Sequence, residues 1–243
     1  MKLFSQTITT FWQTQFLNGD ILYIDKAFTV TINPDLSEDR RVMMLETSDG
    51  RVMAVLTPEL ADKLDLYQWQ DLSEFAFRQK LIEIGVTLHG ADYLFYFSRA
   101  EKNILMQEPL ESSLRQLTEQ DETIFSEFES AASKQDLDDA YVELDHWAVF
   151  GSFEKSRLVS AASMYPWGNA QQIADLGVLT LIPFRGKGHA RKVVRSICKY
   201  AYNQEYEPQY RCQLDNEASV SLAKAAGFTL FGKWETISPN STD

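Results

Sequence analysis

Arg185-Gly186-Lys187-Gly188-His189-Ala190 is a glycine-rich turn that separates an apolar, strand-like run (Leu176 to Phe184) from a helix with an apolar stripe. Glycine has no Cβ and tolerates positive φ, so the backbone of such a turn can approach a ligand closely. The first-turn N–H groups of a helix have no partner inside the helix, and the helix dipole adds partial positive charge there. The turn therefore predicts a site for a phosphate or pyrophosphate.

Two common phosphate-binding patterns do not fit this turn. The Walker pattern Gly-x-x-x-x-Gly-Lys-[Ser/Thr] is excluded, because no glycine precedes Arg185 at that spacing and His189 follows Gly188. The dinucleotide pattern Gly-x-Gly-x-x-Gly is excluded as well, because Arg191 stands where the third glycine is needed for helix–strand packing.

Arg-x-x-Gly-x-Ala after Val178-Leu179-Thr180 instead resembles the coenzyme A loop of the GNAT superfamily, the acyl-CoA-dependent N-acyltransferases. A second motif strengthens the resemblance. Residues 215–228, Asp-Asn-Glu-Ala-Ser-Val-Ser-Leu-Ala-Lys-Ala-Ala-Gly-Phe, are similar to the family's Asn-x-x-[Ala/Ser]-x-x-Leu-x-x-x-x-Gly-Phe helix. Gly227 suits the left-handed end of that helix. The resemblance spans roughly Leu117 to Trp234.

The resemblance implies an α/β (α+β) protein with a GNAT-type mixed, mostly antiparallel sheet flanked by helices. It implies an acyltransferase domain at residues 106–243, preceded by a smaller N-terminal α/β domain at 1–105. The residue pattern predicts a hairpin turn at 47–50, a helix over 71–84 and a linker over 99–113. We leave two roles open for the N-terminal domain, covering the acceptor site and forming a homodimer interface.

Within the acyltransferase domain, the pattern predicts a capping box that starts a helix at Thr118. Strands are expected over 146–153, 157–165 and 172–180, and a helix over 189–202.

The resemblance also implies acetyl-CoA as the acyl donor. Val178, Leu179 and Thr180 would bind the pantetheine arm, and residues 185–190 would hold the pyrophosphate. Asn216 would contact the arm as well, although it also suits a helix cap. The basic side chains near the turn either reach the ribose phosphate or are solvated surface: Lys187, Arg191 and Lys192.

Acyl transfer to an amine requires an aligned thioester, a neutral amine and a stabilised thiolate. Asp175 is the candidate base, since many relatives place a carboxylate on this strand; the alternative is a hydrogen-bonding residue. Many relatives carry a tyrosine general acid where this chain has Ala223. We predict acetyl transfer from acetyl-CoA to an unidentified primary amine by direct attack in a ternary complex. The absent tyrosine leaves a non-catalytic acyl-CoA sensor or scaffold as the alternative.

The acceptor region of the family corresponds here to a stretch with acidic and aromatic side chains, which suit an amine through charge pairing and cation–π contact. These are Asp136, Asp138, Asp139, Tyr141, Tyr165 and Trp167. A solvated helix N-terminus is the alternative for the acidic residues. His146 and His189 can titrate near neutral pH.

Composition and net charge argue against several classes of protein. The 243 residues carry a formal net charge of −12, which argues against a nucleic-acid partner. No run approaches the ~20 apolar residues of a membrane helix, and the first 20 residues show no signal-like apolar block. Cys198 and Cys212 are expected to be reduced core residues. We therefore expect a cytoplasmic protein that uses no metal and binds no membrane.

Overall fold

The computed structural model describes residues 3–69, 71–109, 111–167, 172–239 and 241. It divides into two compact units: a first unit of residues 1–8, 95–211 and 217–229, and a second unit of residues 9–94, 212–216 and 230–243. Three strands contribute residues to both units: β5 (Asp92–Phe97), β10 (Glu207–Gln213) and β11 (Phe228–Thr236). The predicted domain boundary at residue 105 stays a prediction.

The sheet of the first unit has the strand order β5-β10-β9-β8-β7-β6. The other strands are β6 (Leu114–Leu117), β7 (Ala148–Glu154), β8 (Arg157–Pro166) and β9 (Ile173–Thr180). Neighbours from β6 to β9 pair antiparallel, whereas β9 and β10 run parallel. The mixed, mostly antiparallel sheet is therefore confirmed. The predicted hairpin of β7 and β8 is confirmed too, with positive φ at Lys155 (50°) and Ser156 (67°) in its turn.

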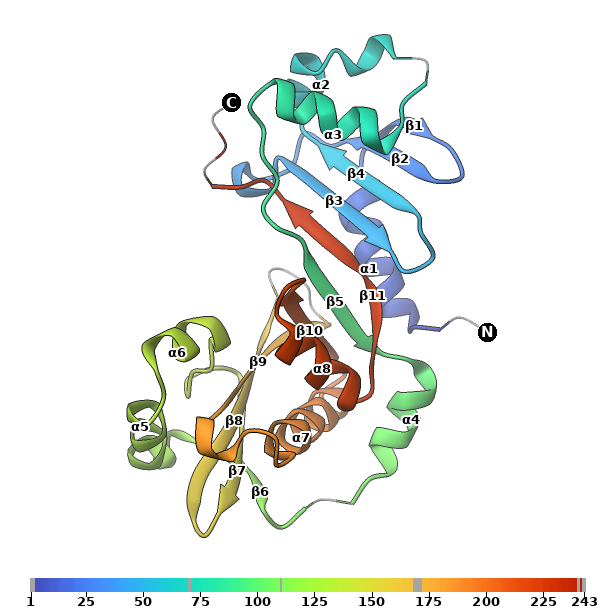
Figure 1. Cartoon of the computed structure of the whole chain (residues 1–243). Helices are drawn as coiled ribbons and strands as arrows, with labels where there is room; N and C mark the ends of the chain where they lie inside the picture. The colour runs from blue at the N-terminus through green and yellow to red at the C-terminus, as the bar shows by residue number, and fades with distance from the viewer. Residues whose placement is uncertain (1–2, 70, 110, 168–171, 240, 242–243) are drawn as a thin grey trace. The chain divides into compact units, whose positions relative to one another are not determined.

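Helices cover both faces of this sheet (Figure 1). On one face, α7 (His189–Asn203) packs on β7, β8 and β9. On the other face, α5 (Glu122–Ser130) and α6 (Lys134–Ala140) pack on β8 and β9. Phe125 and Phe128 of α5 share a buried apolar cluster with Ala161 and Leu179 of the sheet. α4 (Arg99–Gln107) and α8 (Glu217–Ala225) both contact α7.

The predicted linker over 99–113 is wrong in its first part, which forms α4. The helix begins there because Ser98 Oγ accepts a hydrogen bond from the backbone N–H of Glu101 at 3.2 Å. Ser98 and Glu101 form the S-x-x-E pattern of a helix start. The mixed charge and Pro109 of the segment favour a linker, but the local pattern at residues 98–101 starts a helix.

The predicted capping box at Thr118 is confirmed. The Thr118 side chain accepts from the backbone N–H of Asp121, and the Asp121 carboxylate accepts from the backbone N–H of Thr118 at 3.0 Å. Arg115 adds two hydrogen bonds to the same carboxylate, at 2.6 and 2.9 Å. These contacts fix the chain direction just before α5, which contributes to the candidate site.

The second unit is built on the strand order β1-β2-β4-β3-β11. Its strands are β1 (Asp20–Ile24), β2 (Phe28–Ile32), β3 (Val42–Thr47) and β4 (Val52–Leu56). The hairpin expected around residues 47–50 is the β3–β4 turn, and the helix expected over 71–84 is α3 (Glu74–Glu83).

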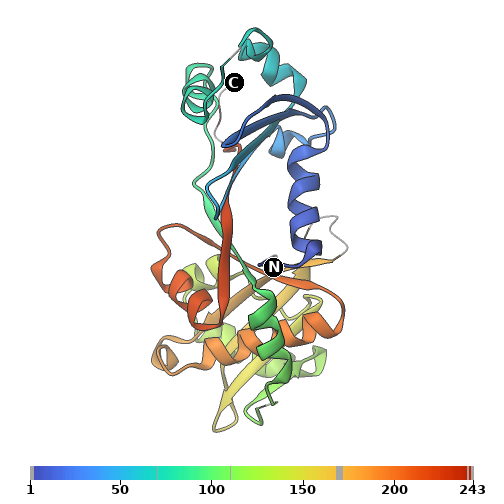
Figure 2. The ribbon, with the colours of Figure 1, turned by 90° about the vertical axis from the view of Figure 1, so that its right-hand side faces the viewer.

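Helices again lie on both sides of this sheet. In Figure 2, α1 (Gln6–Leu17) and α3 lie on opposite sides of the strands. Trp12 of α1 stacks on Phe231 of β11 with ring centroids 6.2 Å apart. The rings of Phe77 of α3 and Phe28 of β2 lie 5.7 Å apart, centroid to centroid. The helix α2 (Pro58–Lys63) contributes Leu60 and Ala61 to the same core. Among the described residues, no helix combines the length and the apolar character needed to cross a bilayer.

Candidate functional site

The glycine-rich turn has the backbone geometry expected of an anion cradle. β9 ends at Thr180, a short 3₁₀ turn (Ile182–Phe184) follows, and Gly188 is the N-cap residue of α7. Gly186 and Gly188 have φ of +74° and +85°, and a Cβ at either position would meet no atom within 4 Å. Glycine is therefore required here by the backbone conformation and not by crowding. Residues 185–188 are exposed and His189 and Ala190 are half-buried, and the first-turn amides of α7 have no partner inside the helix.

Two side chains of the turn are held in place by the rest of the first unit. Arg185 Nε donates to the Thr180 carbonyl at 3.0 Å, and its Nη2 bonds Asp136 Oδ1 on α6 at 2.7 Å. This guanidinium is the main cause that holds the pKa of Asp136 below its usual value. His189 turns back toward the sheet, with Nδ1 2.9 Å from Ser152 Oγ. The side chain of His189 is thus tied to β7, and its backbone N–H remains at the helix start.

The register of β8 and β9 determines where the main chain of β9 points. Leu181 N donates to Val159 O at 3.0 Å, and bonded and non-bonded pairs alternate along an antiparallel ladder. The main-chain groups of Leu179 therefore point toward β8 as well. Those of Val178 and Thr180 point to the opposite edge, where β10 is the neighbouring strand.

The pairing of β9 with β10 stops before these two residues. The last register pair is Leu176 with Tyr210, although β9 continues to Thr180. Val178 and Thr180 thus direct main-chain groups to an edge at which the ladder has ended, and the Thr180 carbonyl already accepts the bond from Arg185. A strand edge of this kind can bind an extended ligand through main-chain hydrogen bonds.

Gly177 lets α6 approach β9 closely. A Cβ on Gly177 would lie 2.1 Å from the Ala140 carbonyl oxygen and 2.9 Å from that of Tyr141. A glycine inside a strand often marks such a close approach of another backbone segment, so the sequence carried this signal. Tyr141, at the C-terminal end of α6, has a φ of 45°, which is unusual for a residue with a side chain.

We expect Gly177→Ala to destabilise the protein by about 1–3 kcal/mol, because the added methyl forces α6 off the sheet. The free energy of unfolding from guanidinium titration measures this. Gly90→Ala is the matched control, since a Cβ there would meet no atom within 4 Å and its φ is not positive. Equal stability of the two variants would show that α6 is free to move away at little cost.

Asp175 lies at the centre of a polar cluster on the face of the sheet that carries α6. It is only 4% exposed. Its carboxylate accepts from Gln209 Nε2 at 3.1 Å, from Arg211 Nη2 at 3.1 Å and from the Tyr165 hydroxyl at 3.4 Å. Burial is the main cause that raises the pKa of Tyr165 to about 12. The role of Asp175 as the base stays a prediction.

A second cluster surrounds His146. The Tyr141 and Tyr165 rings lie 5.0 and 4.9 Å from its imidazole, centroid to centroid. Nδ1 is 2.8 Å from Ser163 Oγ, and Nε2 is 3.7 Å from Glu143 Oε2. Burial is the main cause that lowers the pKa of His146. The sequence singled out three of these residues separately, and the structure brings them together.

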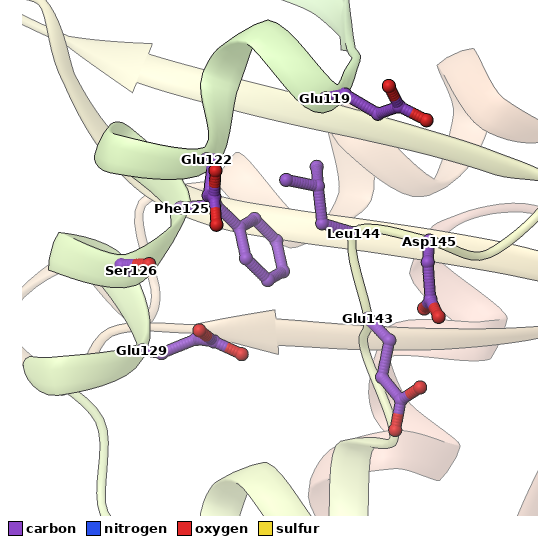
Figure 3. A pocket seen from close by; sticks show the side chains of 8 residues that line it. All are labelled: Glu119, Glu122, Phe125, Ser126, Glu129, Glu143, Leu144 and Asp145. Atoms are coloured by element: carbon purple, nitrogen blue, oxygen red, sulfur yellow. The ribbon is translucent and has the colours of Figure 1, made fainter.

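A pocket of about 550 Å³ opens beside this cluster (Figure 3). Its walls come from α5, from the turn before it and from the chain just before β7: Glu119, Glu122, Phe125, Ser126, Glu129, Glu143, Leu144 and Asp145. In Figure 3 the Phe125 ring and Leu144 lie near the middle, with the carboxylates around them. Sequence reasoning missed this acidic set, because α5 and residues 143–145 meet only in the tertiary structure.

Two of the acidic residues expected in the acceptor region, Asp138 and Asp139, have partners on α6 itself. Lys134 Nζ bonds Asp138 at 2.9 Å, and Gln135 Nε2 donates to Asp139 at 2.7 Å. These are i,i+4 pairs on an exposed helix face, which agrees with the alternative of a solvated helix. Asn216 directly precedes α8 and belongs to the second unit. Its contact with the pantetheine arm stays a prediction.

The chain was compared with known families and structures. A family model described as GNAT acetyltransferase matches residues 71–237. A comparison with curated proteins finds no match.

Three solved structures illustrate the likeness. An acetyltransferase of the GNAT family from Colwellia psychrerythraea is 22% identical, with a TM-score of 0.50 over 68% of this chain and 61% of that one. One from Novosphingobium aromaticivorans is 16% identical, with a TM-score of 0.46 over 63% and 66%. A GCN5-related N-acetyltransferase-like protein from Streptococcus suis is 17% identical, with a TM-score of 0.41 over 69% of each chain. The match spans less than two thirds of the first two chains. At this identity the likeness concerns the fold.

Proposed function

The chain belongs to the GNAT acetyltransferase family, and on that basis we propose that it moves the acetyl group of acetyl-CoA to a primary amine by direct attack in a ternary complex. The observation that carries the proposal is the end of the β9–β10 ladder at Leu176, a few residues before the 185–190 turn. One segment thus offers main-chain groups for an extended arm and then free helix amides for a diphosphate. A coenzyme A thioester has these two parts in sequence.

In this proposal, each part of the segment has one task. Val178 and Thr180 bind the pantetheine arm with their main-chain groups, and the amides of residues 186–190 hold the pyrophosphate. Arg185 supports the turn through Thr180 and Asp136 and adds positive charge beside it. Binding of this kind holds the thioester in a single position, which is the first requirement for attack by an amine.

Fewer residues are available for the step after attack than for binding of the acyl donor. Ala223 of α8 is fully buried, and it offers no proton to the departing thiolate at the position where many relatives carry a tyrosine. Because Ala223 cannot donate a proton, we also consider a second candidate function, a non-catalytic acyl-CoA sensor. Measurements of acetyl-CoA binding and of thiol release distinguish the two functions.

We expect acetyl-CoA to raise the melting temperature of the purified chain, because a ligand that binds only the folded state stabilises it. ATP and NAD at equal concentration are expected to give no shift. Thiol release from acetyl-CoA is then followed with spermidine, tyramine and lysine amide as acceptors. Binding without release on any amine would favour the sensor. Protection by ATP or NAD alone would contradict both functions.

A further inference from the structure

We propose that His146 is the residue that takes the proton from the acceptor amine, with Ser163 fixing the imidazole ring and Glu143 facing its free nitrogen. The inference rests on the proposed acetyl transfer and deepens it. An amine is mostly an ammonium ion at neutral pH and cannot attack until it loses a proton. The chain therefore needs a proton acceptor near the place where the acetyl group is presented.

Ser163 holds the ring of His146 by its Nδ1 side. The Ser163 hydroxyl oxygen lies 2.8 Å from Nδ1, and which of the two atoms donates depends on the tautomer of the ring. In the tautomer with its proton on Nδ1, the ring donates this bond and carries its lone pair on Nε2. We assign this tautomer to the reacting enzyme.

The surroundings of the ring keep this lone pair available and then stabilise the added proton. The side chain is 10% exposed, and its burial favours the neutral ring at pH 7, because it lowers the pKa of His146. The charged and titratable groups around the ring are Glu143, Asp145, Tyr141 and Tyr165. Glu143 Oε2 lies 3.7 Å from Nε2. Its carboxylate offsets the charge of the imidazolium once a proton arrives.

His146 is also close to the expected position of the thioester. Its anchor Ser163 is the register partner of Gly177 on β9, directly after the end of the β9–β10 ladder. Paired residues of an antiparallel sheet point to the same face. That face also carries the Tyr165–Asp175 contact.

The acidic pocket gives a cationic amine a way to reach this ring. Glu143 and Asp145 line the pocket (Figure 3). One carboxylate oxygen from each lies within 4.8 Å of the other and of an imidazole nitrogen of His146. A concave surface of one charge sign raises the local concentration of ions of opposite charge.

Nε2 of His146 takes one proton from the ammonium, which becomes the free amine, and the imidazole becomes imidazolium. The amine nitrogen forms a bond to the thioester carbonyl carbon, and the carbon–sulfur bond breaks. The electron pair of that bond leaves on the CoA thiolate. The thiolate takes the second proton lost by the amine nitrogen, and His146 returns its proton to solvent.

The test compares His146→Gln with the wild-type chain from pH 4.5 to pH 10, using the most active of spermidine, tyramine and lysine amide. At pH 7 we expect kcat/KM to fall by about 100-fold or more, the usual effect of removing a general base. The loss is expected to shrink as the pH rises, because the amine then loses its proton in solution. His89→Gln, the same change at an exposed histidine of the second unit, is expected to leave kcat/KM unchanged.

A second variant tests the proposal without removing the ring. Glu143 raises the pKa of His146, so Glu143→Gln is expected to move the acid limb of the wild-type profile to lower pH. An equal loss for His146→Gln at every pH, or an unmoved limb for Glu143→Gln, would overturn the assignment. Acetyl-CoA binding is measured in parallel. If the wild-type chain neither binds it nor acetylates any amine of the panel, acetyl transfer itself is wrong and this inference falls with it.

Discussion

Aspartate in place of Gly188 is expected to lower the affinity for acetyl-CoA by about 100-fold or more while the chain stays folded. Gly188 is the N-cap of α7, and aspartate is a good N-cap that tolerates positive φ better than most residues. Its carboxylate occupies the first-turn amides and repels the pyrophosphate. Loss of two charge-assisted hydrogen bonds, each worth about 1.5–3 kcal/mol, corresponds to about 100-fold or more in Kd. Isothermal titration calorimetry measures the change.

Gly50→Asp is the matched control for this variant. Gly50 has a φ of +84°, against +85° for Gly188, and a Cβ at either position would meet no atom within 4 Å. The two substitutions place a side chain at nearly the same φ and add the same charge. We expect Gly50→Asp to bind acetyl-CoA as the wild-type chain does. Undiminished binding by Gly188→Asp would mean that the turn does not hold the pyrophosphate.

Methionine in place of Arg195 is expected to destabilise the protein by about 3 kcal/mol. The Arg195 side chain is 9% exposed, and it donates to both Glu108 oxygens at 2.9 and 2.6 Å and to the Ala226 carbonyl. Removing one partner of a buried ion pair costs about 3–5 kcal/mol. Glu108 is 37% exposed, so water compensates part of the loss. Guanidinium unfolding followed by circular dichroism gives the difference.

The same pair predicts a pH dependence with a definite sign. The Arg195 guanidinium is the main cause that lowers the pKa of Glu108 from its usual value of 4.5. Its contribution to stability is therefore fully present above pH 4.5 and is lost as the pH falls through the lowered pKa. The stability difference between wild type and Arg195→Met should shrink in that acidic range.

Lys192→Met on the same helix is the control for Arg195→Met. Lys192 and its partner Glu111 are 45% and 44% exposed, and exposed ion pairs contribute about 0–1 kcal/mol. We expect this variant to unfold close to the wild-type midpoint. If both variants lost equal stability, the cause would be the loss of positive charge on α7 and not the buried contacts of Arg195.

Much of the fold followed from local sequence signals. The capping box at Thr118, the β7–β8 hairpin and the helix that opens after Gly188 depend on residues close in sequence, and all three are confirmed. The glycine pattern pointed to the correct turn conformation as well, because positive φ is a property of single residues. The linker prediction was wrong where a local signal, Ser98 with Glu101, was outweighed by composition.

The candidate site was predictable only in part. The turn and the strand end could be read from one continuous segment. The partners of Asp175 could not, because Gln209 and Arg211 are 34 and 36 residues away in sequence. The same holds for Ser163 and His146, which are 17 residues apart and meet because β7 and β8 pair side by side.

The amino-acid sequence alone carried the motifs that identify the family and the glycine pattern of the 185–190 turn, because each depends on residues close together along the chain. The mostly antiparallel sheet was expected from the family resemblance that these motifs carry. Tertiary structure alone decided which carboxylates gather in the pocket, which groups surround His146 and why residue 177 must be glycine. These features depend on distances of 2–5 Å between segments far apart in sequence. Periodicity assigns a residue to a face of a helix or strand, but only packing brings two faces into register.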